Sequence, residues 1–278
     1  MGNYLYYFQN EKYYNENEDE DENTNKYGWV RDSLDHRDVK LIYKKKHPNF
    51  NMKNNVDLRH LCPGIYNQGK LGSCTANAIA AAYEFNEIVD NEKNLFIPSR
   101  LFIYYNERQI ENTVNNDSGA MIRDGIKSIK KKGVCPETMW PYDIQKFKIK
   151  PNEECYKNAL NHKCSQYKRL NQNLNQLKNA LLFGKPFVFG FSVFESFESK
   201  EIAQTGIMSM PGKDDKLLGG HAVMCVGFSD SKEVFIIRNS WGENWGDKGY
   251  FYMPYEFITN KELCSDFWII EKIKDKNN

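Results

Sequence analysis

The sequence predicts an α+β protein with a helical lobe followed by an antiparallel β lobe. Alanine-rich runs and apolar residues at helical spacing lie before residue 184, whereas strand-like apolar runs come after residue 186. Strands and helices do not alternate, as they would in a parallel βαβ sheet. The chain of 278 residues is 40% hydrophobic, which is enough apolar side chain to form a sizeable core.

Residues 1–50 differ in composition from the rest and are predicted to form a partly ordered N-terminal extension. They contain a tyrosine-rich start, an acidic run over residues 16–22 and a basic run over residues 44–46. Acidic runs are most often solvated, mobile linkers. Trp29 lies between the two runs, and its large apolar side chain indicates that this part docks on the rest of the protein.

Four helices are expected between the extension and the strands. Ser73 is a good N-cap residue for the first, and an alanine-rich run follows it. Gly133 ends the third helix and Gly184 ends the fourth. Residues 143–170 are polar and are expected to be mostly irregular. The expected helices begin at Cys74, begin at Pro98, span about residues 120–132 and span about residues 174–183.

Five strands are expected in the remaining part of the chain. Each is a short run rich in β-branched or aromatic residues. The expected domains are an extension over residues 1–50 and one domain over residues 51–278, with its helical lobe at about 60–170 and its β lobe at about 171–270. The expected strands are residues 187–193, 221–228, 234–239, 249–253 and 267–270.

The net charge, the lengths of the apolar runs and the cysteine content argue against several classes of function. A formal net charge of +1 does not favour nucleic acid or an anionic membrane as the partner. No run of about 18 apolar residues is present and the N-terminus lacks the features of a secretory signal, so no membrane span or secretion is expected. Seven cysteines at irregular spacing do not suggest a disulfide framework. Cys155, His162 and Cys164 match no common zinc motif, so no metal is expected there.

Cys74 is a candidate nucleophile because it begins the first expected helix. Unpaired backbone N–H groups at a helix N-terminus favour a thiolate over a thiol. Gly69 and Gly72 mark the loop before it, and the small alanines after it let the helix bury itself closely. A cysteine that only packs at the start of a helix is the alternative interpretation.

His221 is the candidate base, because it opens a strand that pairs with the next strand through a short turn. If Phe228 pairs near Glu233, the numbers of paired residues add to about 461. His221 then lies opposite Ser240 and beside Asn239. The amide oxygen can accept one ring N–H, so that the other ring nitrogen faces the sulfur, and two nearby tryptophans can shield that bond from water. A buried histidine satisfied by a neighbouring amide is the alternative.

Gln68 is the candidate oxyanion donor. It lies six residues before Cys74, on the loop that leads into the helix. Its side-chain N–H₂ group and the backbone N–H of Cys74 can both point at a developing oxyanion. Each feature is weak alone, but the order Gln, Cys, His and Asn followed by a tryptophan pair is a specific combination.

The combination resembles the papain family of cysteine proteases over about residues 52–270. His221 follows Cys74 by 147 residues, within the range of about 130–150 typical of papain-like enzymes. The motif around Cys74 is closer to the microbial and giant-DNA-virus branch than to the lysosomal one. The resemblance implies a papain-like two-lobed fold, with the active-site cleft between a helical left lobe and a β-barrel-like right lobe. The matching motifs are Gln68-Gly69, Gly72-Ser73-Cys74, His221-Ala222, Asn239-Ser240-Trp241-Gly242, Trp245-Gly246 and Gly249-Tyr250.

The resemblance implies a cysteine endopeptidase that acts on proteins or peptides through a thioester acyl-enzyme and requires no cofactor or metal. Exopeptidase members bind a terminal carboxylate with a loop histidine, and residues 119–142 contain none. The main pocket is expected to prefer an apolar or aromatic side chain two residues before the scissile bond, since none of its implied lining residues is a carboxylate. The implied substrate-binding residues are Ser118, Gly119, Met121, Gly190, Gly219, Gly220, Ala222, Trp241 and Ile269.

The sequence departs from the family pattern at several residues. Leu71 stands where most members carry a disulfide cysteine, and Thr75 replaces the usual aromatic residue. Only single half-cystines, Cys155 and Cys264, match the common disulfides, which is compatible with a reducing compartment. We therefore expect a cytosolic or virion-packaged protein in preference to a secreted or lysosomal one.

The extension over residues 1–50 is shorter than the usual helical propeptide and lacks its motif. We hypothesise that it lies along the cleft and inhibits it, as in a zymogen, with the acidic run responding to pH. A disordered tail is the alternative for the acidic run. Two alternatives to a protease are a catalytically silent papain-like binding or structural protein, and an acyl or peptide transferase that uses the same site.

Overall fold

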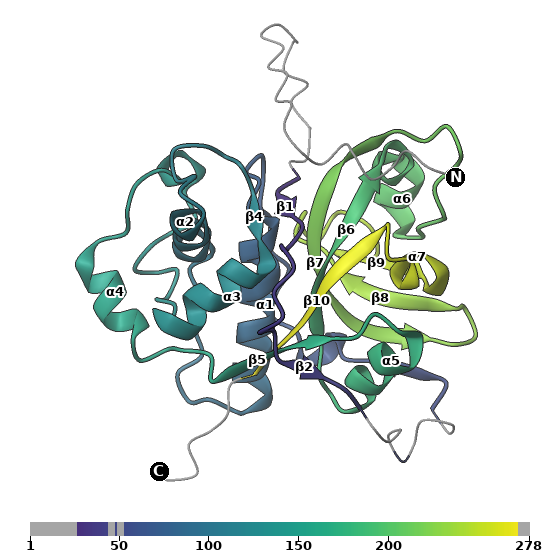
Figure 1. Cartoon of the computed structure of the whole chain (residues 1–278), viewed down its shortest axis with the longest axis horizontal. Helices are drawn as coiled ribbons and strands as arrows, with labels where there is room; N and C mark the ends of the chain where they lie inside the picture. Colours follow the sequence, from purple (N-terminus) through teal and green to yellow (C-terminus); the bar gives the residue numbers. More distant parts are fainter. Residues whose placement is uncertain (1–26, 44–47, 49–52, 272–278) are drawn as a thin grey trace, which may run out of the picture.

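The computed structural model describes residues 27–43, 48 and 53–271. Helices form one lobe and most strands form the other (Figure 1). The predicted two-lobed α+β fold is confirmed. The acidic and basic runs of the extension lie outside the described residues.

The helical lobe is organised around α1 (Cys74–Val89), which packs against two other helices and against the sheet. Its alanines are buried, and their small side chains allow this close approach. Gly133, at a φ of +78°, follows the third helix of the lobe as predicted. The other helices of the lobe are α2 (Arg100–Ile110), α3 (Ile122–Lys131) and α4 (Glu153–Ala159), with a 3₁₀ turn η2 (Ile144–Lys146).

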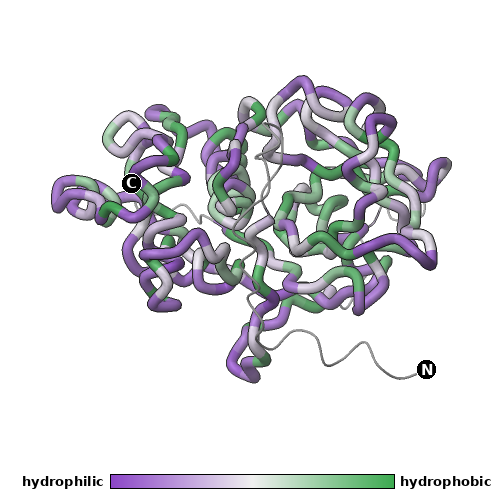
Figure 2. The backbone as a smooth tube through the Cα atoms, turned by 90° about the horizontal axis from the view of Figure 1, so that it is seen from above, coloured by the Kyte–Doolittle hydropathy of each residue, from purple (hydrophilic) through white to green (hydrophobic). Residues whose placement is uncertain are grey.

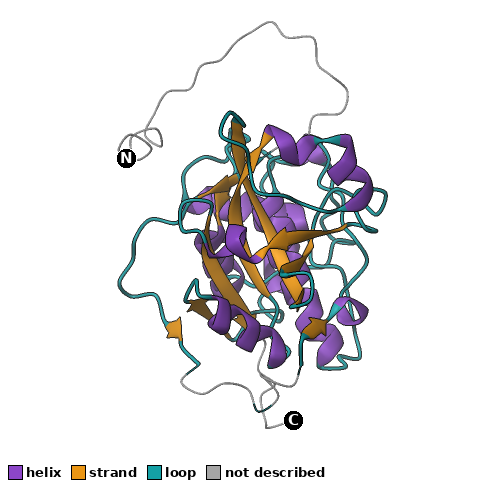
Figure 3. Ribbon diagram, turned by 90° about the vertical axis from the view of Figure 1, so that its right-hand side faces the viewer, coloured by secondary structure: helices purple, strands orange, loops and turns teal. Residues whose placement is uncertain are grey.

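The β lobe is a mostly antiparallel sheet in the order β2-β5-β10-β6-β7-β8-β9, with β3 paired to β7. Its phenylalanine-rich core lies between the sheet and the short helices of the lobe, and Figure 2 shows hydrophobic chain concentrated inside it. Figure 3 shows these strands in front of the helical lobe. The strands are β2 (Lys40–Leu41), β3 (Asn55–Asp57), β5 (Gln166–Leu170), β6 (Phe187–Phe194), β7 (Leu217–Ser229), β8 (Val234–Arg238), β9 (Tyr250–Pro254) and β10 (Cys264–Glu271).

Three features of this lobe and its neighbourhood differ from the sequence predictions. Residues 143–170 are not mostly irregular: Asn152 caps α4 by accepting from the Cys155 N–H, and β5 is held by its pairing with β10. Ala120 belongs to a short strand, so α3 begins later than predicted. Short helices and turns that were not predicted are η1 (Arg59–Leu61), η3 (Glu195–Glu198), α6 (Lys200–Thr205) and α7 (Tyr255–Thr259). The predicted fourth helix is present as α5 (Leu174–Leu182).

The register between β7 and β8 differs from the predicted one by one to two residues. Phe228 pairs with Phe235, so the residue numbers add to 463, and Met224 pairs with Arg238, so they add to 462. The change occurs at a bulge between Cys225 and Gly227. The predicted sum of about 461 is one to two residues too low, because the turn between the paired residues Ser229 and Val234 is longer than assumed.

Residues 27–43, called the strap below, run between the two lobes (Figure 1). β1 (Trp29–Val30) pairs in parallel with β4 (Ala120–Met121) of the helical lobe. Further along the strap, β2 pairs in parallel with β5 of the β lobe. The strap is thus attached to both lobes by main-chain hydrogen bonds, and the prediction that the region around Trp29 docks on the body agrees with these contacts.

None of the helices among the described residues is both long enough and apolar enough to span a bilayer. In the same residues, no group of three or more His, Cys, Asp or Glu side chains comes together in a way that could hold a metal ion.

Candidate active site

Cys74 is the first residue of α1 and is fully buried. Burial raises the pKa of its thiol to about 12, and backbone N–H groups of Ala222, Gly28 and Thr75 oppose this rise. The sequence predicted a lowered pKa from the helix N-terminus alone. The loss of solvent thus outweighs the helix dipole and favours the neutral thiol.

Ser73 holds the N-cap position of α1, but its side chain does not cap the helix. Its hydroxyl lies 2.5 Å from the Tyr142 hydroxyl and 3.0 Å from Asn77 Nδ2. The start of α1 is therefore tied to side chains of the helical lobe, and this fixes the position of Cys74.

His221 lies on β7, and its Nε2 is 2.8 Å from Asn239 Oδ1 just beyond β8. The Ser240 backbone N–H donates to the same Oδ1 at 2.8 Å, which identifies that atom as the amide oxygen. Nε2 therefore carries the proton in the neutral ring. The other ring nitrogen, Nδ1, is buried and has no hydrogen-bond partner among the described residues.

The imidazole is fully buried beneath Trp241, whose ring centroid lies 4.9 Å from that of His221. Trp245 packs edge-on against Trp241 at 5.0 Å, so the two tryptophans cover the histidine as predicted from their positions in the sequence. Burial lowers the pKa of His221 to about 4, and the Asn239 bond opposes that shift. Both the thiol and the imidazole are thus neutral in this state.

The Cys74 thiol lies against the strand that carries His221, because the backbone N–H of Ala222 contacts its sulfur. Ala222 is the next residue after His221 on β7, and α1 packs directly on that strand. The two residues lie 147 positions apart in the sequence, and the contact between α1 and β7 unites them.

Gln68 is buried between the lobes and bonded to both. Its Oε1 accepts from the Ser240 hydroxyl at 2.7 Å, and its Nε2 donates to the Leu71 carbonyl at 3.0 Å. Its backbone N–H also donates to the Ser240 carbonyl at 2.9 Å. These bonds fix the orientation of the amide, and the bond to Leu71 uses one of its two N–H hydrogens.

The strap passes directly over Cys74. A Cβ atom on Gly28 would lie 1.8 Å from the Gly72 carbonyl oxygen, and one on Gly119 would lie 2.0 Å from the Gly28 carbonyl oxygen. That carbonyl accepts from the Ala120 N–H at 2.8 Å. Only glycines allow the two backbones to approach this closely. Met121, another predicted substrate-binding residue, pairs with Val30 of the strap.

Tyr27 of the strap lies beside His221 and Trp241. Its ring centroid lies 6.4 Å from that of His221 and 6.3 Å from that of Trp241, and its hydroxyl bonds to Glu198. A Cβ on Gly219 would come within 2.9 Å of the Tyr27 side chain. Three predicted substrate-binding positions, Gly119, Gly219 and Trp241, therefore contact or adjoin the strap.

Trp29 occupies a socket in the β lobe formed by Gly190, Gly220 and Asp266. A Cβ would lie 1.9 Å from the indole ring at Gly190 and 2.7 Å from it at Gly220. The indole N–H donates to Asp266 Oδ2 at 3.1 Å. Ile269, predicted to line a pocket here, is buried in the core of the β lobe.

Sequence reasoning missed Asp266. Asp266 directly precedes the apolar run 267–270, and this was the available signal, because charged side chains are rarely buried without a partner. The expectation that no carboxylate lines this region therefore needs correction: Asp266 contacts the Trp29 indole directly. Asp266 also has a φ of +60°, a conformation that aspartate tolerates better than most residues.

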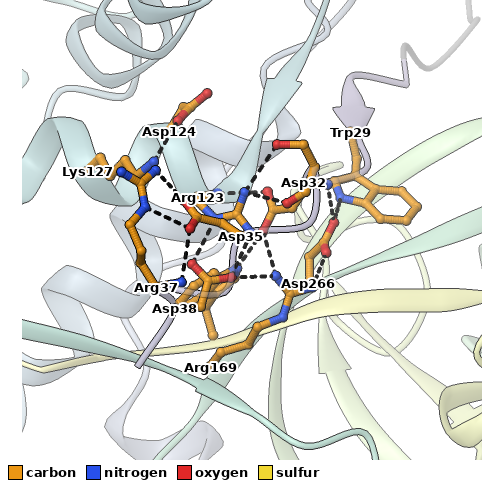
Figure 4. A network of polar contacts seen from close by, with 12 residues as sticks. Trp29, Asp32, Asp35, Arg37, Asp38, Arg123, Asp124, Lys127, Arg169 and Asp266 are labelled. Carbon is orange, nitrogen blue, oxygen red and sulfur yellow. Dashed lines mark hydrogen bonds and ion pairs between the residues drawn. The ribbon is translucent and has the colours of Figure 1, made fainter. Parts of the chain in front are cut away.

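Two arginines anchor the strap behind the socket (Figure 4). Arg123 of α3 binds Asp38 at 2.7 Å, and Arg169 of β5 binds Asp38 at 3.1 Å and Asp266 at 2.7 Å. Asp32 of the strap accepts from the Trp268 indole at 2.8 Å. Since α3 and β5 belong to different lobes, this anchor joins the strap to both.

Asp32 is a buried carboxyl close to another carboxyl. Burial first, and then the charge of Asp266, raise the pKa of Asp32 to about 7, while hydrogen bonds from Trp268 and Arg123 oppose that shift. The two residues are in direct contact, because the Asp32 backbone N–H donates to Asp266 Oδ2 at 2.8 Å, and Arg169 lies within 3.5 Å of both carboxyl groups.

Comparison with known proteins identifies the family to which the chain belongs. The model of the papain family cysteine proteases matches residues 52–265, most of the chain. The chain belongs to this family. An uncharacterized peptidase C1-like protein of Acanthamoeba polyphaga mimivirus is 45% identical over 272 residues, covering 90% of this chain and 88% of that protein. Chymopapain of Carica papaya is 26% identical over 208 residues, covering 72% of this chain and 54% of that one.

Among solved structures, xylellain, a cysteine protease from Xylella fastidiosa, matches with a TM-score of 0.81 and 47% identity. The match covers 89% of this chain and 96% of that one. The chain is accordingly a papain-like thiol protease with protein or peptide substrates, from a microbial or viral branch as the motif around Cys74 predicted.

Proposed function

We propose that the protein is a cysteine endopeptidase in which Cys74 attacks the scissile carbonyl carbon and His221 handles the proton. In the reactive state the thiol proton moves to His221 Nδ1, and the sulfur bonds to the carbonyl carbon. Asn239 holds the ring through Nε2, while Gln68 and the Cys74 backbone N–H donate to the tetrahedral oxyanion.

Two proton transfers complete the cycle. His221 gives its proton to the leaving amine as the C–N bond breaks, which leaves a thioester on Cys74. Water then loses a proton to His221 and attacks the thioester carbonyl, and the thiol and a carboxylic acid are released. No cofactor or metal takes part in these steps.

The observation that carries this proposal is the bond between His221 Nε2 and Asn239 Oδ1. It fixes the tautomer in which Nδ1 is a buried acceptor with no described partner, on the strand that touches the Cys74 sulfur. A purely structural histidine would have both ring nitrogens satisfied, because an unpaired buried acceptor is costly. The unpaired nitrogen therefore supports a role in proton transfer.

We further propose that the full chain is latent because the strap blocks the site. Gly28 lies over Cys74, Tyr27 lies beside His221 and Trp29 fills the adjoining socket. The resulting dehydration favours the neutral thiol and imidazole over the reactive ion pair. Displacement of the strap would restore solvent and space for a substrate.

The decisive experiment compares Cys74→Ala with Cys62→Ala in the full chain, using fluorogenic dipeptide amides. We expect turnover to vanish in the first variant and to persist in the second, whose thiol lies near Leu58, outside the site. Labelling of Cys74 by an epoxysuccinyl inhibitor checks the same site without turnover. Activity that survives Cys74→Ala would exclude this mechanism.

The two alternatives predict different results in the same assays. A catalytically silent binding protein would neither turn over substrate nor react at Cys74 with the inhibitor. A transferase would give amide products when an amine is added and little hydrolysis in its absence.

A further inference from the structure

The socket that holds Trp29 distinguishes side chains by shape and by a hydrogen bond. Gly190 and Gly220 form its walls, and neither position has room for a Cβ while the indole is present. Asp266 forms its floor and accepts the indole N–H at 3.1 Å. The strap residue seated here therefore shows which side chain the socket fits.

The two oxygens of Asp266 have separate partners. Oδ1 accepts from Arg169 Nη2 at 2.7 Å, whereas Oδ2 accepts the Trp29 indole N–H and the Asp32 backbone N–H, both from the strap. The Ser265 hydroxyl adds a weaker hydrogen bond to the same carboxyl group. Asp266 is 2% exposed. When the strap leaves, Oδ2 loses both of these donors while Arg169 still balances the charge.

A buried acceptor without a donor is unfavourable, so a ligand that restores an N–H at Oδ2 gains affinity over one that does not. Because Arg169 already neutralises the carboxylate, an uncharged donor is sufficient. The walls accept a flat bicyclic ring of the size of indole.

We propose that the socket is the substrate side-chain pocket of this protease and that Asp266 makes it selective for tryptophan. The proposal rests on the protease function proposed above, and it replaces the expected general preference for apolar or aromatic side chains. Aromatic rings of the same size that lack an N–H are discriminated against, because they leave Oδ2 unpaired.

The test uses two N-acylated dipeptide amides in one reaction with the full chain. They carry tryptophan or 3-benzothienylalanine two residues before the scissile bond, so that they differ by the replacement of N–H with sulfur. Competition in one vessel gives the ratio of their kcat/KM values whatever fraction of the enzyme is free of the strap. We expect tryptophan to be preferred by about tenfold or more, and a ratio near one overturns the inference.

Two variants assign the preference to Asp266. Asp266→Gly removes the acceptor and keeps a residue that tolerates the φ of +60°, so the ratio should fall to near one. Asp32→Asn changes a carboxyl group in the same cluster. The side chain of Asp32 bonds to the Trp268 indole, whereas the Trp29 indole bonds to Asp266, so the ratio should remain as in the wild type. A preference that survives Asp266→Gly contradicts the proposed role of the carboxylate.

A binding measurement separates this inference from the protease function. The full chain carrying Cys74→Ala and Trp29→Ala has an inert sulfur and an emptied socket, and the two peptides are titrated into it by calorimetry. Tryptophan peptide bound about tenfold more tightly supports the inference even if no variant shows turnover. Equal affinities, or no binding of either peptide to the folded variant, overturn it.

Discussion

At the scale of single residues, solvent exclusion decides the chemistry of the site. Cys74 and His221 are both fully buried, and burial shifts both pKa values toward the neutral forms. A helix N-terminus favours a thiolate, but its field is smaller than the desolvation of a buried sulfur. Both shifts favour the neutral thiol and imidazole, which is the form that we propose to be latent.

Asn239 positions the imidazole and does not touch the substrate in the proposed mechanism. Replacing it with alanine removes the acceptor for Nε2–H and lets the ring rotate, so kcat should fall by about 10-fold to 100-fold with a smaller change in KM. Asn239→Asp keeps an acceptor and adds a negative charge. It should retain more activity and shift the acidic limb of the pH–rate profile upward, whereas identical profiles for both variants would contradict the positioning role.

Asp32 makes docking of the strap depend on pH. Its pKa is raised from an unfolded value of about 3.9 to about 7, so docking is strongest below about pH 4 and weakens as the pH rises through 7. The labelling rate of Cys74 in the wild type, divided by that in Asp32→Asn, should therefore rise by about tenfold or more between pH 5 and pH 8. The ratio cancels the titration of the thiol itself.

A constant or falling ratio would show that Asp32 is not the titrating group. The same measurement with Asp266→Asn, which removes the charge that faces it, should flatten the pH dependence. The charged or titratable groups around Asp32 are Asp266 of β10, Arg169 of β5, Arg123 of α3, Glu111 after α2 and Asp38 of the strap.

At the scale of elements, α1 and β7 bring the chemistry together and the strap covers it. Alanines on α1 let it approach β7, which carries His221. The strap then adds β1 to the helical lobe through main-chain bonds to β4. Main-chain pairing does not depend on side-chain identity, so the glycines at the crossing control how closely the strap can approach.

Gly28→Ala should release the strap in the full chain. The added methyl group would overlap the Gly72 carbonyl, and an overpacked contact of this kind costs about 1–3 kcal/mol, enough to raise activity by about tenfold. Turnover of a fluorogenic peptide measures the effect. Gly64→Ala is the matched control, since no atom lies within 4 Å of its Cβ position, and unchanged activity in both variants would argue against inhibition by the strap.

At the scale of the whole molecule, the strap links the two lobes through the anchor of Asp32 and Asp38. Arg123 comes from the helical lobe and Arg169 from the β lobe, and both bind Asp38. Figure 4 shows these side chains converging from different elements. The same network joins the lobes and anchors the strap that we propose to be inhibitory, so we expect latency and stability to be coupled.

Asp38→Ala should weaken the anchor by about 2–3 kcal/mol, because it removes the ion pair of the buried Arg123 guanidinium. Arg169 loses one of its carboxylate partners and keeps Asp266. We expect a lower Tm and higher peptidase activity in the same variant. Asp35→Ala is the control: within the described part of the chain its carboxylate pairs with the exposed Arg37 of the strap itself, so both readouts should stay unchanged. A lower Tm without any gain in activity would separate the anchor from inhibition.

Much of the fold could be predicted from local signals in the sequence. The helix after Ser73, the helix ended by Gly133 and the strand 187–193 follow from capping, glycine and periodicity. The strand β5 within residues 143–170 could not be predicted in this way. Its conformation depends on pairing with β10, about a hundred residues later in the chain, and with β2 of the strap. The hairpin register was close because β7 and β8 are adjacent in the chain, and its error came from the length of the turn, which the bulge partly offsets.

The sequence by itself determined the family and the types of residue at the site, since these depend on short motifs and on the order of Gln68, Cys74, His221 and Asn239. Only the tertiary structure decided that the thiol is neutral and that Asp266 receives the Trp29 indole. Burial is a property of the assembled molecule, and Trp29 and Asp266 are 237 residues apart. No local pattern encodes a contact at that separation, because it depends on how both lobes and the strap pack together.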